Sequence, residues 1–334
     1  MALRLIEMVL PEKDSGEVRE LLKEHNVLEH RQVRLSDGEV LVRILLDAEQ
    51  SEAVLDLLEK WYTVGEDNRV VILPVEATLP RADPEQATTP EQPSSEEKPP
   101  ERIGREELYE DIKDAARWSR VYLAMVVLST IVATVGLLYN SVPIIIGAMV
   151  IAPLLGPNMA LALGTTLGDL SLLRRALLAS LAGIGTAMAL SVIIGMLVHV
   201  DPALSEVTAR TRVGLGDIAV ALASGCAGAL AFTTGVSTTL IGVMVAVALL
   251  PPLVTFGLLL GGGQPALAMG ALSLFLLNLI CVNLAGVTTF LVQGIRPASW
   301  WEKDRAVKAT RIAIGLWVTL LAALVSLILL LREG

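Results

Sequence analysis

Residues 146–157 read I-G-A-M-V-I-A-P-L-L-G-P, and residues 241–252 read I-G-V-M-V-A-V-A-L-L-P-P, with seven of twelve positions identical at an offset of 95 residues. Both stretches lie within long apolar runs, although proline removes a backbone donor and clashes with the carbonyl one turn earlier. In hydrocarbon the freed carbonyls need partners from protein or water. Paired interruptions in two halves of a chain are typical of a transporter's binding site. The pattern predicts two proline-broken helices that line a cavity; bent but occluded helices are the alternative.

The residues that would form this site are small or lack a backbone donor. They are Gly147, Pro153, Gly156, Pro157 and Asn158 in the first stretch, and Gly242, Pro251 and Pro252 in the second. The N-termini of half-helices can face an anion, while unwound carbonyls can coordinate a cation. The stretches therefore predict substrate contacts made by backbone groups.

Composition places the chain in a membrane class. It is 53% hydrophobic, with a mean hydropathy of +0.62. Residues 1–116 hold 14 Lys/Arg and 28 Asp/Glu, whereas residues 117–334 hold 12 Lys/Arg and 7 Asp/Glu. A low acid content over a long apolar half is what burial in a bilayer requires. The acidic first part argues against nucleic acid as a partner. We expect Cys226 and Cys281 to be packing residues.

Residues 1–78 predict a soluble α+β head. Strands are expected at residues 2–10, 27–35, 39–47 and 69–75, with a hairpin turn at Ser36-Asp37-Gly38. A capping box at residues 14–17 would start the first helix. The second helix, from Ser51, would bury Val54, Leu55, Leu58 and Trp61. The order β-α-β-β-α-β is the ferredoxin-like arrangement. We expect His25 and His30 to be surface histidines.

Two connecting segments follow the head. Residues 79–103 are rich in proline and acids, which predicts a flexible linker. Residues 104–117 predict a charged amphipathic helix that leads into a transmembrane domain at 118–331.

Seven membrane spans are expected, each close to the ~20 residues that cross a bilayer. They lie near 118–138, 142–165, 173–198, 214–232, 237–260, 266–292 and 311–331. If the head is cytoplasmic, nine Lys/Arg flank the spans inside and three outside, which fits the positive-inside rule. His199 would then be an interface residue at an outer helix end.

The number of spans determines how the two halves of the repeat would be oriented in the membrane. Spans one to three form one unit and spans four to six form a second. Because each unit has an odd number of spans, the second unit would cross the membrane in the opposite orientation. The seventh span would be an addition to this repeat. Ser129 aligns with Ser224 at the same offset of 95 residues. Chance similarity between apolar helices is the alternative.

Polar side chains within the spans are further candidates for the site. Asn278 and Asn283 lie about 140° apart around the sixth span, so one could line a site while the other bonds a neighbouring helix. Asp217 is either a coupling carboxylate within the fourth span or a surface partner of Arg210 or Arg212. Five hydroxyl residues between spans four and five form either turn caps or an inner vestibule: Thr233, Thr234, Ser237, Thr238 and Thr239.

The sequence offers no signs of catalysis or of a cofactor. We find no phosphate loop, no metal-ligand spacing and no nucleophile with a partnered base, so we expect neither an enzyme nor a cofactor. No Lys or Arg lies in mid-membrane and aromatic residues are only 4% of the chain, which disfavours polyanions and large planar ligands. A small neutral or singly charged solute fits best.

Three motifs resemble one known family: G-A-M-V-I-A-P-L-L-G-P at 147–157, A-V-A-L-L-P-P-L at 246–253 and G-A-L-S-L-F-L-L-N-L at 270–279. The chain resembles the "uncharacterised hydrophobic domain" family, domain of unknown function 389, over about residues 120–292. The family usually has proline soon after the arginine of the loop at 209–213, whereas Val213 and Gly214 follow here, so no role is carried over for that loop. The resemblance implies a multi-pass protein of the bacterial or archaeal cytoplasmic membrane, and it implies no substrate.

Together these patterns predict a secondary transporter or channel-like permease with a regulatory or oligomerising cytoplasmic head. The bilayer, a small solute or ion, and a second copy in a homodimer are the expected partners. The alternative is a membrane sensor or scaffold that transports nothing and whose head binds an effector or a partner.

Overall fold

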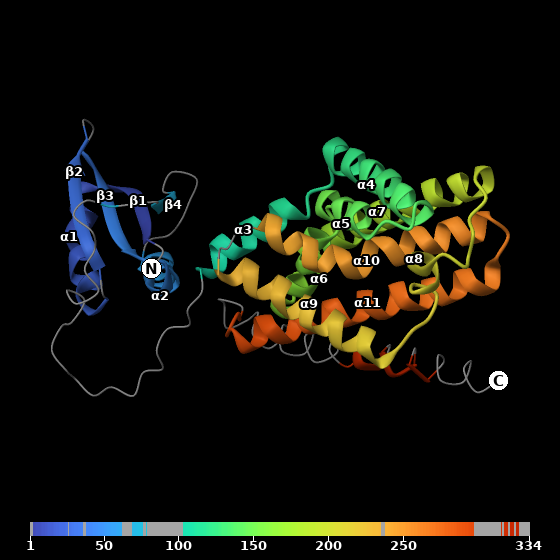
Figure 1. The fold of residues 1–334 in the computed structure, drawn as a ribbon. Coiled ribbons are helices and arrows are strands. Elements are labelled where there is room, and N and C mark those ends of the chain that lie inside the picture. The colour runs from blue at the N-terminus through green and yellow to red at the C-terminus, as the bar shows by residue number, and fades with distance from the viewer. Residues whose placement is uncertain are drawn as a thin grey trace. The chain divides into compact units, whose positions relative to one another are not determined.

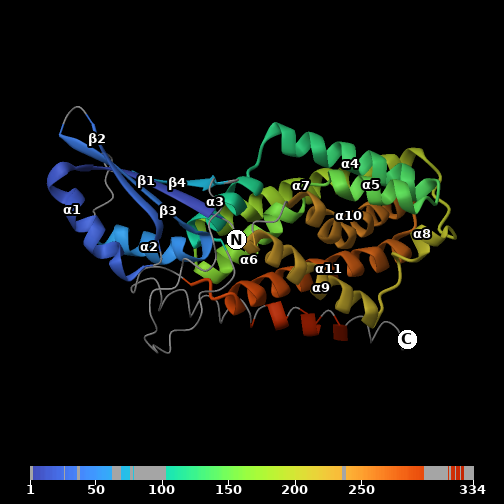
Figure 2. The same ribbon diagram turned by 60° about the vertical axis from the view of Figure 1, so that its left-hand side comes forward.

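The computed structural model describes residues 3–25, 27–35, 38–61, 69–75, 78, 103–234 and 238–296, and beyond these only 315, 317–319, 321–323 and 325–326. Within these ranges, the side chains of residues 14, 17, 24, 59, 60, 215 and 238–248 are not described. The chain divides into two compact units, Met1–Leu108 and Tyr109–Gly334. The elements of both units are labelled in Figures 1 and 2.

The first unit contains a four-stranded antiparallel sheet and two helices. Its elements are β1 (Leu3–Pro11), α1 (Glu12–Leu21), η1 (Leu22–Glu24), β2 (Val27–Arg34), β3 (Glu39–Asp47), α2 (Ala48–Trp61) and β4 (Val70–Val75). The strand order is β2-β3-β1-β4, and each neighbouring pair is antiparallel. Gly38, with a φ of 74°, ends the turn between β2 and β3. The predicted β-α-β-β-α-β order is therefore present.

One face of the sheet carries the core of this unit. Burial alternates along β1, so that Ile6, Met8 and Leu10 point to the same side. Val18 of α1 and Leu58 of α2 belong to the same buried cluster, so both helices cover that face, as Figure 2 shows.

Two expectations for the head are wrong. Helix α1 begins at Glu12 with Pro11 as its N-cap, so the helix starts before residues 14–17 and these residues do not open it. Trp61 is 57% exposed. It is the last residue of α2 and lies beyond Leu58, the last buried residue among the described side chains of that helix.

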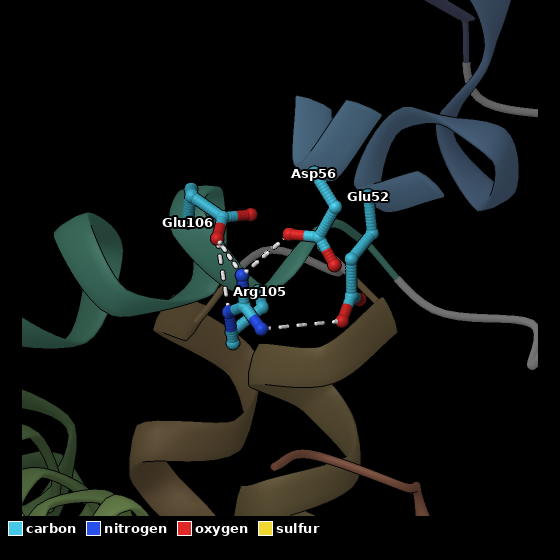
Figure 3. A network of polar contacts seen from close by, with 4 residues as sticks. All are labelled: Glu52, Asp56, Arg105 and Glu106. Carbon is cyan, nitrogen blue, oxygen red and sulfur yellow. Dashed lines mark hydrogen bonds and ion pairs between the residues drawn. The ribbon is translucent and has the colours of Figure 1, made fainter. Parts of the chain in front are cut away.

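The first turn of α3 (Arg105–Ala115) packs with the head. The Arg105 guanidinium lies 2.9 Å from a carboxylate oxygen of Asp56 and 3.9 Å from one of Glu52, and it also pairs with Glu106 (Figure 3). Buried Arg4 donates two hydrogen bonds of 2.7 Å to Glu107. The first compact unit thus runs to Leu108, past the linker predicted at 79–103, of which only residue 103 is described.

The second unit is helical. From Tyr109 on it holds the rest of α3, then α4 (Arg120–Leu138), α5 (Val142–Ile151), α6 (Leu155–Leu167), α7 (Leu170–Leu197), α8 (Ser205–Thr208), α9 (Leu215–Thr234), α10 (Thr238–Gly261) and α11 (Pro265–Val292). Among the described residues, four helices are long and apolar enough to cross a membrane, and α5 with α6 makes a fifth if the pair is one span. These helices are consistent with a multi-pass membrane protein.

Helix α10 is central to this unit. It contacts α4, α5, α6, α7, α9 and α11. It coincides with the expected fifth span, although its described side chains cover only Leu249–Gly261. The expected seventh span falls mostly outside the described residues. Helix α10 therefore positions the elements that surround the candidate site.

Candidate functional site

The first proline-containing stretch forms a sharp break between two helices. Helices α5 and α6 meet at an angle of 54°. Ala152, at the C-terminus of α5, has an extended backbone (φ −68°, ψ 118°), as expected for a residue that precedes proline. Pro157 is the third residue of α6, where its missing N–H has no intrahelical partner to lose. Pro153 thus ends α5 and Pro157 lies in the first turn of α6, so the predicted break is present.

The second stretch differs from the expectation. Helix α10 runs through Pro251 and Pro252 as one element, so the prediction of a second broken helix is wrong. The two prolines are adjacent, so the lost donors affect only one turn, at the carbonyls of Val247 and Ala248. Neighbouring helices can satisfy such carbonyls in a membrane protein. Pro251 and Pro252 are buried in the centre of the unit.

A pair of buried asparagines lies beside the break. Asn283 of α11 donates a 2.9 Å hydrogen bond from Nδ2 to Oδ1 of Asn158, in the first turns of α6. Asn158 donates in turn to the Leu154 carbonyl at 2.7 Å. Asn283 is fully buried, and its Oδ1 has no hydrogen-bond partner in the described structure. The break is therefore joined to α11 by polar contacts within an apolar interior.

A small cavity opens next to this pair. It has a volume of about 10 Å³, which is close to the minimum that holds one water molecule. Pro157, Asn158, Ser180 and Leu249 are among the residues that line it. The Ser180 hydroxyl is buried and has no partner among the described residues. Ser180 belongs to α7, and sequence reasoning missed it because one serine in a long apolar helix carries no signal.

Of the other residues predicted to form the break, Gly156 has a packing role. A Cβ added to Gly156 would lie 2.9 Å from the Cβ of Ala115, so this glycine lets α6 approach the end of α3. Gly147 and Pro153 are only half-buried, and a Cβ on Gly147 would meet no other atom within 4 Å. Gly242 lies in the part of α10 without described side chains. Gly156 thus contributes to close packing.

The remaining polar candidates lie elsewhere. The Ser129 hydroxyl donates to the Val126 carbonyl of its own helix, and Ser224 is buried in α9. Asn278 is buried in α11 and does not line the cavity. Of the two asparagines in the sixth span, the structure therefore brings Asn283 to the break.

Asp217 caps a helix. Its Oδ2 accepts a 2.7 Å hydrogen bond from the backbone N–H of Gly214, just before α9 begins. Arg210 pairs instead with Glu206 at 2.8 Å, so the alternative in which Asp217 pairs with Arg210 is wrong, and the described residues show no ion pair between Asp217 and Arg212. This bond is one half of a capping box, and it accounts for the position of the acid in the first turn of α9.

The hydroxyl cluster between spans four and five bonds within its own helix where it is described. Thr233 and Thr234 both donate to the Leu230 carbonyl at 2.9 Å. Ser237 and the side chains of Thr238 and Thr239 lie outside the described residues. These two hydroxyls bond within the last turns of α9, and the choice between turn caps and a vestibule stays a prediction.

Two close helix crossings flank the site. A Cβ added to Gly286 of α11 would lie 2.8 Å from the Cβ of Ala162 on α6. A Cβ added to Gly257 of α10 would lie 2.7 Å from the Cβ of Ser191 on α7. Both distances are shorter than real side chains tolerate. These glycines therefore set the spacing of the helices around the break.

A polar contact lies at the start of α7, outside the apolar segments. Tyr109 donates a 2.7 Å hydrogen bond to Asp169, which caps the backbone N–H groups of Ser171 and Leu172. Burial alone would raise the pKa of Asp169, but these hydrogen bonds outweigh it and hold the pKa below its usual range. Asp169 therefore stays ionised at neutral pH.

The described residues hold no group of three or more His, Cys, Asp or Glu that could bind a metal ion. Cys281 packs in a buried cluster with Ala221 and Leu277. The polar groups at the break are side-chain amides and a hydroxyl, together with backbone carbonyls.

Comparisons with known proteins agree with the motifs at the break. The model of a family described as "Domain of unknown function (DUF389)" matches residues 149–284, which include the break and both asparagines. "Uncharacterized protein MJ0678" of Methanocaldococcus jannaschii is 36% identical over 98% of this chain and 99% of its own length. No solved structure matches the chain significantly. The chain belongs to the DUF389 family.

Proposed function

We propose that this protein is a secondary transporter or channel-like permease for a small neutral or singly charged solute. The observation that carries the proposal is the break between α5 and α6, with Asn158, Asn283 and Ser180 around it. A broken helix and unpartnered polar atoms are costly in an apolar interior, and polar groups inside a membrane protein usually mark a path for a solute. The donor set suits a solute that is recognised by hydrogen bonds or by neutral oxygen ligands.

An inverted repeat would supply the moving parts. Helices α7 and α11 each have 28 residues, and their first residues are 95 positions apart. The contact of Gly286 with Ala162 and that of Ser191 with Gly257 are related by the same offset, with the roles of the two halves exchanged. These relations support two three-helix units of opposite orientation, the arrangement in which one unit rocks against the other.

Under this proposal, the size of the small cavity indicates which conformational state of the transporter the structure represents. A volume of about 10 Å³ leaves room for about one water molecule, so the structure corresponds to an occluded state. Transport then requires α6 to move relative to α7 or α11. The membrane location and a cytoplasmic head are parts of the same proposal, supported by the apolar helices and the positive charges that flank them on the head's side.

The test is solute flux in vesicles that contain the purified protein. Stopped-flow swelling with urea and glycerol covers neutral solutes, and dye-reported flux of sodium and potassium covers monovalent cations. We expect flux of at least one probe above that of empty vesicles, and a loss with Asn283→Leu or with Pro157→Ala plus Pro252→Ala. Gly185→Ala is the control, because this helical glycine has open space around it. Flux equal to that of empty vesicles for every probe would contradict the proposal.

The same small cavity favours a second candidate, a membrane sensor or scaffold that transports nothing. An interior that never opens would need no larger cavity than the observed one. This candidate predicts no flux of any probe, together with binding of an effector by the head.

A further inference from the structure

The head carries a groove that the proposed transport does not use. It lies between the end of α1 with η1 on one side and the edge strand β2 on the other, and its volume is about 460 Å³. Small-molecule sites typically have about 300–1,000 Å³. The groove therefore has room for a small organic molecule.

The charge of the groove is opposite to that of its domain. Residues 1–75 hold 9 Lys/Arg and 16 Asp/Glu. The polar residues of the groove comprise two cations, two histidines, one amide and one acid: Arg19, Lys23, His25, His30, Gln32 and Glu29. The acid, Glu29, is already paired with Arg31. A basic groove in an acidic domain is a feature that selects an anion.

The groups in the groove are held close together. Gln32 donates from Nε2 to the Ser15 carbonyl at 2.7 Å, and the same nitrogen lies 3.5 Å from Nε2 of His30. Burial lowers the pKa of His30, and the positive charge of Arg19 lowers it further. Among the described residues, Lys23 pairs only with exposed Glu20, and Arg19 forms no ion pair. Arg19 thus presents to His30 a positive charge that no described acid pairs with.

We propose that this groove binds a small organic molecule through a phosphate group, with Arg19 as the principal contact. The planar guanidinium binds phosphate oxygens in pairs, and Lys23, His25 and His30 supply further donors from separate elements. Several donors around one space favour a dianion over a monoanion. An apolar floor of Leu22, Val27 and Leu28 would contact the organic part. The site would make the head a receptor for an anionic effector.

The three histidines of the chain allow a direct test with the full-length protein in detergent. His25 and His30 line the groove, and His199 belongs to the other compact unit. Ring-labelled histidine signals are followed by NMR during titration with inorganic phosphate and, separately, with acetate at the same pH and ionic strength. We expect a saturable shift of the His25 and His30 signals with phosphate, a weaker response to acetate, and no shift of His199.

Two arginine variants separate specific binding from general charge. Arg19→Gln should weaken phosphate binding about tenfold or more, since it removes a charge-assisted contact. Arg34→Gln on β2 removes the same charge outside the groove and should change the affinity less than about twofold, the effect of a screened surface charge. If Arg19→Gln perturbs the signals of the free protein, Arg19→Lys replaces it and should show an intermediate loss. Shifts that do not saturate, an equal response to acetate, or equal losses in the two Gln variants would overturn the proposal.

Discussion

The Nδ2 atom of Asn283 donates a 2.9 Å hydrogen bond to Oδ1 of Asn158 and thereby joins α11 to the first turns of α6, directly after the helix break. The two residues are 125 positions apart in the chain, and both are buried. This contact brings the break and the other half of the helical unit together, so its energy should bear on both stability and flux.

A double-mutant cycle should detect this contact. Asn158→Leu and Asn283→Leu each remove one partner, and the coupling between them should be about 0.6–1.7 kcal/mol, as for other hydrogen bonds between membrane helices. Unfolding of the purified protein in detergent gives the four free energies. Additive effects of the two substitutions, within error, would show that the contact contributes nothing.

The two glycine crossings should tolerate no added methyl group. Gly286→Ala and Gly257→Ala each place a Cβ within 2.8 Å of a carbon atom of the facing helix, so each should destabilise the protein by about 1–3 kcal/mol. Gly185→Ala adds the same methyl group where no atom lies within 4 Å, and it should be neutral or stabilising by up to about 1 kcal/mol. Thermal unfolding in detergent measures all three. Equal effects at Gly185 and Gly286 would show that the crossings are not close.

The cap at the start of α7 should give a pH-dependent stability. Because the folded-state pKa of Asp169 is depressed, its contribution is present above the unfolded value of 3.8 and is lost as the pH falls through the folded pKa. Asp169→Ala should therefore cost about 1–2 kcal/mol at neutral pH and progressively less in acid. Unfolding of wild type and variant over a pH series measures the difference. Exposed Asp114, replaced by Ala, is the control, and a difference that stays constant below pH 3.8 would contradict the linkage.

The pairing of Arg4 with Glu107 should tie the start of α3 to the head. Glu107→Gln removes a charge from a mostly buried bidentate pair and should destabilise the first unit by about 1–3 kcal/mol. Glu110→Gln alters an exposed pair with Lys113 and should have little effect. Hydrogen exchange of β1 amides in the full chain reports the difference. Equal exchange in the two variants would place the boundary of the head before α3.

The head could be predicted from the sequence because its signals are local. The alternation of apolar residues in β1 and the glycine turn before β3 locate strands in the sequence, whereas the order β2-β3-β1-β4 follows from the pairing seen in the structure. The start of α1 and the exposure of Trp61 were the exceptions, and for Trp61 the reason is that periodicity assigns a residue to a face but does not say where the sheet under that face ends.

The break was predictable only in part, for a physical reason. Prolines four residues apart can end one helix and start another, whereas adjacent prolines such as Pro251 and Pro252 affect a single turn of a helix that neighbours hold on all sides. The sequence pattern marks both stretches as candidates for a break, but it does not distinguish a broken helix from a continuous one. The place of Ser180 at the cavity and the pairing of Asn283 with Asn158 both result from which helices pack together. The spacing of residues along the chain does not contain that information.

Cysteine accessibility at position 180 tests the central claim most directly, since it needs no knowledge of the solute. Ser180→Cys is made in a protein whose Cys226 and Cys281 are replaced, and a charged, water-soluble thiol reagent is applied to sealed vesicles from one side and then from the other. A transporter that opens alternately should show labelling from both sides, and Ser129→Cys, at a fully buried position away from the cavity, should stay unlabelled. If position 180 is labelled from neither side, there is no solute path at the helix break and the account is contradicted.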